Sequence, residues 1–140
     1  FNSKENIIVA PIICYESIYG SFVTEYVRNG AQLLVIISND AWWGDTEGHR
    51  QLLSYSKLRA IENRRAIARS ANTGISSFID KNGNIIEKIG YNRNGIMVRN
   101  IGLENKITFY AKYGDYIARI AILMFILNAL FLFKNFLIKK

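Results

Sequence analysis

The sequence IIVAPIICYESIYGSFVTEYVRNGAQLLVIIS, residues 7–38, decides the fold of this chain. It contains two continuous apolar runs of strand length, residues 7–14 and 33–38, and such runs are typical of strands that are buried on both faces. Between them, apolar side chains recur every four residues from Ile18 to Tyr26, which predicts a helix. A strand, a helix and a strand within about 30 residues predict a βαβ unit with parallel strands and a right-handed crossover.

Three residues mark the ends and the edge of this unit. Ser17 is placed to cap the predicted helix, and Gly30 is placed to end it. Pro11 lies inside the first predicted strand, where it removes a hydrogen-bond donor from the ladder. We therefore expect a bulge or a sheet edge at Pro11.

The alternation of strands and helices continues as far as residue 115. A second helix is predicted over residues 49–64, with an apolar face formed by Leu52, Tyr55, Leu58 and Ile61. The turn signal Lys81-Asn82-Gly83-Asn84 predicts a hairpin. Further strands are predicted over residues 66–71, 75–80, 85–89 and 96–101. This pattern predicts an α/β layered domain.

The C-terminal end of the chain predicts a membrane helix. Residues 120–138, IAILMFILNALFLFKNFLI, would form a helix about 28 Å long, close to the roughly 30 Å of a hydrocarbon core. The alternative, an amphipathic core helix, needs a polar face, and none is present from Ile120 to Phe133. We predict a transmembrane helix over residues 116–138. The excess of lysine after it predicts that residues 139–140 are a cytoplasmic tail and that residues 1–115 lie on the outer face.

Charge and composition argue against several classes of protein. The net charge is +7, but residues 1–116 carry 14 Lys and Arg against 11 Asp and Glu, while the last 24 residues carry four Lys and Arg and no acid. This distribution does not suit a nucleic-acid-binding face. One cysteine excludes an intramolecular disulfide, and one cysteine with one histidine argues against a zinc cluster. We expect no metal or other cofactor.

Three polar segments are predicted to meet at the carboxyl edge of the sheet, where α/β proteins bind ligands. They are Cys14-Tyr15-Glu16, residues 39–44 (NDAWWG) and Asn72-Thr73-Gly74. A cysteine at the turn from strand to helix is suited to nucleophilic catalysis, because a helix N-terminus favours the thiolate and the backbone N–H of Tyr15 can stabilise an oxyanion. The alternative is that Cys14 is a small buried hydrophobe.

The other candidate residues each have two interpretations. Trp42 and Trp43, in a polar loop, either contact a ligand, partner or lipid or anchor the loop by burial. Glu16 is a base, an orienting group or a helix N-terminal charge. His49 either pairs with Cys14 or, as we prefer from its place at a helix start, caps that helix or lies on the surface. Four arginines are interpreted mostly as a solvated helix face, with one buried pair to Glu62: Arg59, Arg64, Arg65 and Arg69.

These segments resemble the nitrilase, or carbon-nitrogen hydrolase, superfamily, and most closely its membrane branch, the apolipoprotein N-acyltransferases. The resemblance rests on residues 13–16 (ICYE), 38–44 (SNDAWWG, with Trp43 in place of a phenylalanine), 59–62 (RAIE), 72–74 (NTG) and 110–115 (Y-x-x-x-GD). It implies that residues 1–115 are the C-terminal portion of a nitrilase-like α-β-β-α sandwich. It also implies that this partial domain is followed by the transmembrane helix.

The resemblance implies an acyl transfer in two steps. Cys14 would take an acyl chain from a phospholipid as a thioester and pass it to the N-terminal amine of a diacylglyceryl-cysteine apolipoprotein. Tyr15 and Glu16 would support the nucleophile turn, and Trp42 and Trp43 would contact substrate. The enzyme would be a multi-pass protein of the bacterial inner membrane with its catalytic domain on the periplasmic side.

The same resemblance predicts what this chain lacks. The family's general-base glutamate and its lysine belong to segments N-terminal to residue 1, so we expect residues 1–140 alone to be inactive. Two alternatives stay open: a nitrilase-type amidase that acts on a small amide, and a membrane-tethered remnant that binds lipid or lipoprotein without catalysis. A start codon immediately before Phe1 would favour the remnant.

Overall fold

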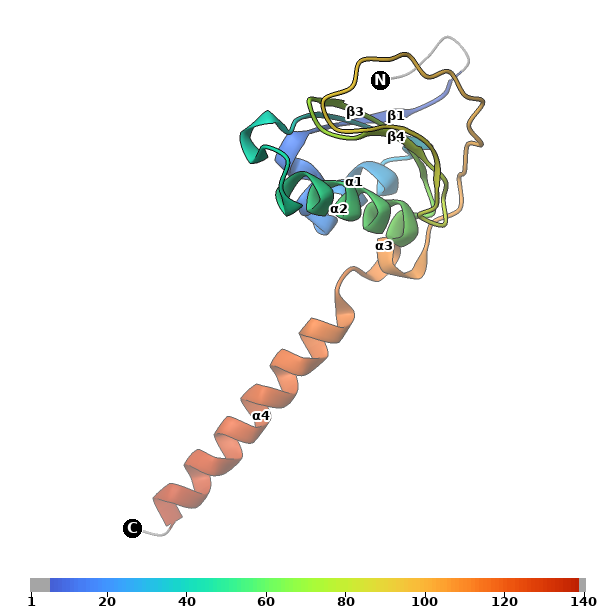
Figure 1. The fold of residues 1–140 in the computed structure, drawn as a ribbon. Coiled ribbons are helices and arrows are strands. Elements are labelled where there is room, and N and C mark those ends of the chain that lie inside the picture. The colour runs from blue at the N-terminus through green and yellow to red at the C-terminus, as the bar shows by residue number, and fades with distance from the viewer. Residues whose placement is uncertain (1–5, 139–140) are drawn as a thin grey trace.

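Five strands form one mixed sheet in the computed structural model, which describes residues 6–138 (Figure 1). The order in the sheet follows the chain: β1 (Val9–Ile13), β2 (Leu33–Asn39), β3 (Ala66–Asn72), β4 (Ser76–Ile79) and β5 (Ile85–Ile89). β1, β2 and β3 are parallel, and β4 and β5 return antiparallel. The predicted parallel β-α-β arrangement is therefore confirmed.

Pro11 lies in an edge strand of this sheet. Among the described residues β1 pairs only with β2, so the missing N–H of Pro11 faces no second ladder. The sheet edge expected at Pro11 is confirmed for the described part of the chain.

Helices cover one face of the sheet (Figure 1). They are α1 (Gly20–Arg28), α2 (Glu47–Asn63) and the short α3 (Phe109–Tyr113), with 3-10 turns η1 (Cys14–Ile18) and η2 (Ala41–Trp43) at the carboxyl edge. The core lies between these layers, where Ile12, Ile36 and Ile67 from three neighbouring strands are fully buried with residues of α1 and α2. Alternation along each strand sends every second side chain to this face.

The helix after β1 begins later than the sequence predicts. Residues 14–18 form the 3-10 turn η1, and Tyr19 is the N-cap of α1. The prediction that Ser17 caps this helix is wrong, because the Ser17 hydroxyl instead donates to the carbonyl of Cys14 at 2.9 Å. Ser17 thus closes the turn that carries the cysteine.

The buried face of α2 is also different from the predicted one. Leu52 is buried, but Tyr55, Leu58 and Ile61 are exposed. The face that packs inward includes His49, Leu53, Ser56, Arg59, Ala60 and Asn63. Three of these polar side chains, His49, Ser56 and Arg59, have hydrogen-bond partners outside the helix, as described below.

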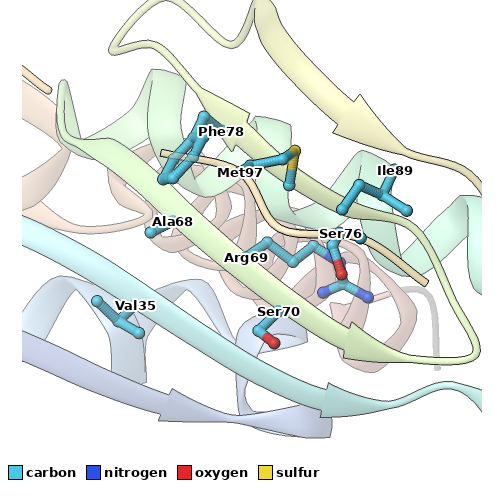
Figure 2. Close-up of a pocket in the computed structure, with 9 residues that line it drawn as sticks. Val35, Ala68, Arg69, Ser70, Ser76, Phe78, Ile89 and Met97 are labelled. Carbon is cyan, nitrogen blue, oxygen red and sulfur yellow. The ribbon is translucent and has the colours of Figure 1, made fainter. Parts of the chain in front are cut away.

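An extended segment, residues 93–108, which we call the strap, crosses the opposite face of the sheet (Figure 1). The predicted strand over residues 96–101 is wrong, because the strap has no strand pairing and Ile96 and Val98 are largely exposed. Side-chain contacts hold the strap, including an ion pair between Arg99 and Glu87 of β5. Between strap and sheet lies a hollow of about 230 Å³, with Met97 facing Phe78 and Ile89 (Figure 2).

The chain then leaves the sheet as one long helix, α4 (Tyr116–Ile138). Residues 116–135 have a mean hydropathy of 2.2 and none of the window is buried, so the helix is long and apolar enough to cross a membrane. Figure 1 shows it projecting away from the sheet and its covering helices. The predicted cytoplasmic tail, residues 139–140, lies outside the described residues.

Candidate functional site

Cys14 lies directly after β1, at the carboxyl edge of the parallel strands. Its φ of +51° is in the left-handed region, which costs a residue with a Cβ roughly 1 to 3 kcal/mol and is found preferentially at functional sites. The thiol is free and partly exposed. The α-helix that the sequence analysis aims at the sulfur begins only at Gly20, so η1 stands between α1 and the thiol.

The three segments predicted to meet at this edge do meet. The Ser38 hydroxyl at the end of β2 lies 3.5 Å from the Cys14 sulfur. The backbone N–H of Asp40 donates to the carbonyl of Asn72 at 3.2 Å, and the Asn72 side-chain amide donates to Asn39 Oδ1 at 3.3 Å. Backbone and side-chain contacts therefore join all three strand ends.

Tyr15 and Glu16 shape the turn behind the cysteine. A Glu16 carboxylate oxygen accepts a hydrogen bond from the backbone N–H of Ile13 at 2.7 Å, which closes the turn around Cys14. Tyr15 is half exposed and meets the Tyr19 ring edge-on, with 6.4 Å between centroids. The carboxylate of Glu16 thus points toward the backbone.

The two tryptophans differ in their surroundings. Trp42 is 86% exposed and Trp43 is 42% exposed. The Trp43 ring lies against Gly48 on α2, so closely that a Cβ at Gly48 would stand 2.5 Å from the ring. Burial therefore anchors the loop through Trp43 only in part, and Trp42 is free to contact another molecule.

An aromatic hollow of about 120 Å³ opens beside the cysteine turn. Its lining includes Tyr15, Ile18 and Trp43 on the loop side and Leu52 and Tyr55 on α2.

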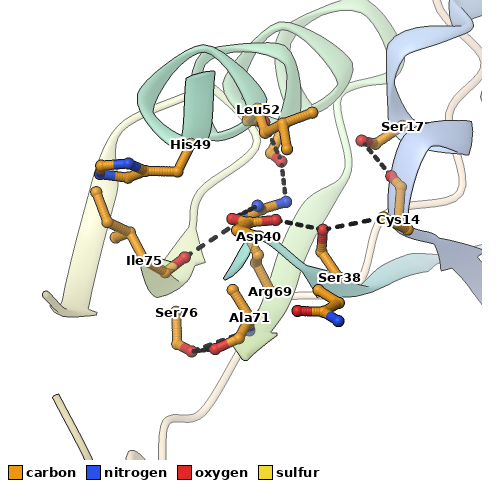
Figure 3. A network of polar contacts seen from close by, with 12 residues as sticks. Cys14, Ser17, Ser38, Asp40, His49, Leu52, Arg69, Ala71, Ile75 and Ser76 are labelled. Carbon is orange, nitrogen blue, oxygen red and sulfur yellow. Dashed lines mark hydrogen bonds and ion pairs between the residues drawn. The ribbon is translucent and has the colours of Figure 1, made fainter. Parts of the chain in front are cut away.

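Beneath these loops lies a buried ion pair that the sequence analysis missed. The Asp40 carboxylate accepts hydrogen bonds from Arg69 at 2.6 Å and from Ser38 at 2.5 Å (Figure 3). Arg69 also donates to Ser56 Oγ on α2 and to the carbonyl of Ile75. Both ionic side chains are wholly buried. Arg69 is in register with Ile36 on the core face of the sheet. An arginine on that face needs a buried partner, and this need is the signal that could have indicated the pair.

Three of the four arginines of this group are buried, where the sequence predicts mostly a solvated helix face. Arg59, Arg65 and Arg69 are buried, so the interpretation of this group as mostly a solvated face is wrong. The expected buried pair is present, since Arg59 donates to Glu62 at 2.9 Å. Burial raises the pKa of the Glu62 carboxyl, and the Arg59 guanidinium opposes that shift. Arg59 also donates to the carbonyl of Ile18 and so ties α2 to the end of the cysteine turn.

His49 is neither a cap nor a surface residue. It is 1% exposed, its Nδ1 lies 3.1 Å from the carbonyl oxygen of Gly44, and its ring stacks on Tyr91 at 4.6 Å. The N-cap of α2 is Thr46, whose side chain accepts from Gly48 N. Within residues 6–138, no three His, Cys, Asp or Glu side chains come together in a way that could hold a metal ion.

This arrangement, a cysteine turn at the end of a parallel strand beside the NDAWW and NTG loops, is that of a carbon-nitrogen hydrolase. The chain belongs to this family, because the carbon-nitrogen hydrolase profile matches residues 3–108. Its fold is similar to a solved amidase from Nesterenkonia sp. AN1, with a TM-score of 0.51 and 21% identity over 64% of this chain and 36% of that one. In that structure an acetamide moiety is covalently attached to the active-site cysteine.

Among curated proteins, the chain is homologous to apolipoprotein N-acyltransferases. It is 38% identical to that of Chlorobaculum tepidum over 124 residues, which cover 87% of this chain and 23% of the relative. It is 31% identical to apolipoprotein N-acyltransferase 1 of Treponema denticola over 137 residues, or 96% of this chain and 25% of the relative. The chain thus spans about a quarter of the length of these relatives.

Proposed function

We propose that this chain is the nucleophile-bearing part of an apolipoprotein N-acyltransferase. The observation that carries the proposal is the placement of Cys14. It follows a parallel strand, has a positive φ, and lies beside Ser38 and the loop that exposes Trp42. The homology to apolipoprotein N-acyltransferases and the long apolar helix α4 support a substrate that resides in a membrane.

The proposed chemistry has two transfers through Cys14. The thiolate attacks the ester carbonyl of a phospholipid, a thioester forms, and the lysophospholipid leaves with a proton on its new hydroxyl. The free α-amine of a diacylglyceryl-cysteine apolipoprotein then attacks the thioester, an amide forms, and the thiol is restored as the amine loses a proton. A cysteine suits this path because a thioester reacts readily with an amine.

The neighbouring residues have supporting roles in this proposal. Glu16 holds the turn through the N–H of Ile13, and Tyr15 supplies a backbone N–H near the reacting carbonyl. Trp42 and Trp43, with the aromatic hollow beside them, contact acyl chains. The resemblance assigns the general-base glutamate and the lysine to other segments, so we predict that residues 1–140 alone do not turn over.

The proposed location is the bacterial inner membrane, in a multi-pass protein. α4 would cross the membrane and the sheet domain would face the periplasm, where lipoproteins are acylated. The motivating observation is the apolar span over residues 116–135. Three lysines, Lys134, Lys139 and Lys140, lie toward the C-terminal end of the span, and one arginine, Arg119, lies near its start. This excess of positive charge favours a cytoplasmic C-terminal end.

The second candidate is an amidase acting on a small amide, which the likeness to the Nesterenkonia amidase fold favours. One experiment separates the two candidates: the intact protein that carries this chain, in detergent, is offered phosphatidylethanolamine with a diacylglyceryl lipopeptide, or a set of small amides. We expect N-acylated lipopeptide, no ammonia from the amides, and loss of the product in Cys14→Ala. Ammonia release without lipopeptide acylation would replace the transferase with the amidase.

A further inference from the structure

Among residues 6–138, Ser38 is the only residue whose hydroxyl contacts the Cys14 sulfur. The same hydroxyl also contacts the buried carboxylate of Asp40. Cys14 directly follows β1 and Ser38 lies at the end of the neighbouring strand β2, so both residues are at the carboxyl edge of the sheet. Ser38 Oγ stands 3.5 Å from Cys14 Sγ and 2.5 Å from Asp40 Oδ1 (Figure 3). A serine hydroxyl has one proton, so it can donate to only one of these two neighbours at a time.

The geometry and the charge decide where that proton goes. An ionised carboxylate at short distance is a much stronger acceptor than a sulfur atom at 3.5 Å. Asp40 forms a buried ion pair with Arg69, whose guanidinium donates to the other carboxylate oxygen at 2.6 Å. The Ser38 proton is therefore committed to Asp40, which leaves a Ser38 lone pair toward the sulfur.

The NTG turn fixes this carboxylate from the other side. A Cβ at Gly74 would overlap the Asp40 carboxylate, so only glycine lets the turn approach this closely. The Asp40 backbone N–H is also bound, to the carbonyl of Asn72. Asp40 therefore has little freedom to turn away from Ser38.

We propose that Ser38 and Asp40 are positioning residues for Cys14, in a chain in which the thiol donates to Ser38 and Ser38 donates to the Arg69-bound Asp40. Asp40 is held by Arg69 and orients the chain, and the thiol proton leaves to the general-base glutamate that the resemblance assigns to another segment of the intact protein. Ser38 holds the neutral thiol in one rotamer and offers no hydrogen bond to the thiolate. This role rests on the proposed function of Cys14 as a nucleophile.

Other charged groups around the turn are engaged elsewhere. Glu16 accepts from Ile13 N, and His49 on α2 meets the carbonyl of Gly44. Arg59, also on α2, is bound to Glu62 and to the carbonyl of Ile18. The sulfur's protonation should therefore respond chiefly to Ser38 and Asp40.

The test measures alkylation of Cys14 by iodoacetamide against pH in the intact protein, read on the peptide that contains Cys14. Ser38→Ala removes the acceptor of the thiol proton, so the midpoint should move to lower pH and alkylation at pH 7 should become roughly threefold to tenfold faster. If Ser38 instead donated to the thiolate, the midpoint would rise. A midpoint that rises or does not change overturns the proposal.

A matched control and a second variant make the result specific. Ser17→Ala removes a hydroxyl that binds the Cys14 carbonyl, at 2.9 Å, and should leave the midpoint unchanged. An equal shift in Ser17→Ala overturns the proposal. If Ser38→Ala does not fold, Ser38→Gly takes its place: it also removes the hydroxyl that accepts the thiol proton, and the midpoint should again fall. An unchanged or higher midpoint in that variant would also overturn the proposal.

A second measurement, the rate of thioester formation from phosphatidylethanolamine, uses the same variants. Ser38→Ala should slow thioester formation from phosphatidylethanolamine by about tenfold with little change in KM, because the sulfur loses its fixed rotamer. An unchanged rate with the predicted midpoint shift would overturn the positioning role. If the parent protein forms no thioester at all, the proposed function fails, while the alkylation result still decides the hydrogen-bond chain.

Discussion

Asp40 and Arg69 show how single residues join the loops of this site. Their ion pair is wholly buried, and Arg69 also contacts α2 through Ser56 and the NTG turn through the carbonyl of Ile75. A buried ion pair is not in itself strongly stabilising, because both charges lose their hydration. Removal of one partner is costly, since it leaves the other charge buried without compensation.

This cost gives a stability prediction. Arg69→Met should lower the free energy of unfolding by about 3 to 5 kcal/mol, because Asp40 is left buried and unpaired. The control is Arg50→Met, which removes an exposed arginine that pairs with Glu47 and should cost less than about 1 kcal/mol. Thermal unfolding of the intact protein in detergent measures both variants. Equal losses would contradict the account of this pair.

At the residue scale, the sequence could predict the cysteine turn but not the buried arginines. Cys14 follows an apolar run, so its position at a strand end is readable from local pattern. Arg59 and Arg69 lie among other charges, and their burial depends on partners that come from distant segments, Ile18 and Asp40. The burial of His49 likewise depends on a distant residue, Tyr91, against which its ring lies.

Among the elements, the strap shows how side chains can hold a segment that has no regular structure. Glu104 is its anchor: the carboxylate accepts from the backbone N–H of Lys106 and of Asn105, and from the Lys81 ammonium at the β4–β5 turn. These bonds, that of Lys106 first, lower the pKa of Glu104 from 4.5 to about 2. The ionised carboxylate therefore stabilises the folded strap.

The pH dependence of this contribution can be worked out. Between pH 4.5 and 2 the unfolded chain binds a proton at Glu104 that the folded chain does not, so stability falls as the pH falls. Glu104→Gln should be less stable than the parent above pH 4.5, and the difference should shrink toward pH 2. Acid unfolding followed by tryptophan fluorescence, with Glu47→Gln as an exposed control, measures this. A difference that is constant over this range would contradict the role of Glu104.

Elements were predictable where local pattern and packing agree. β1 and β2 coincide with apolar runs, β5 has the predicted bounds, and the hairpin turn between β4 and β5 follows its Asn-Gly signal. Residues 96–101 have the composition of a strand but form no strand pairing within the described chain. The strap crosses the face of the sheet instead of joining its edge. For α2, periodicity alone selected the exposed apolar residues, while the buried face is fixed by polar contacts.

As a whole, the described molecule is a sheet with helices on one face, the strap on the other, and α4 projecting away (Figure 1). Apolar side chains of the strap-side face, such as Ile13 and Ile37, are about half exposed. That face is the one on which a second sheet packs in an α-β-β-α sandwich, so we expect it to be covered in the intact protein.

The orientation of α4 gives a prediction for the whole chain. In a Cys14→Ala background, Asn94→Cys on the exposed strap should react with a membrane-impermeant maleimide in spheroplasts. Lys140→Cys should react only after the membrane is disrupted, because the proposed orientation has that end of the chain in the cytoplasm. Labelling of both positions in intact spheroplasts would contradict a helix that crosses the membrane.

The proposed acyl transfer requires that Cys14 carry an acyl group, which can be measured on that residue. Membranes that contain the intact protein are incubated with phosphatidylethanolamine bearing an alkyne-tagged acyl chain, and the peptide containing Cys14 is isolated. We predict a label on Cys14 that neutral hydroxylamine removes and that a diacylglyceryl lipopeptide discharges. A Cys14 peptide that stays unlabelled, or a label that persists in Cys14→Ala, would contradict it.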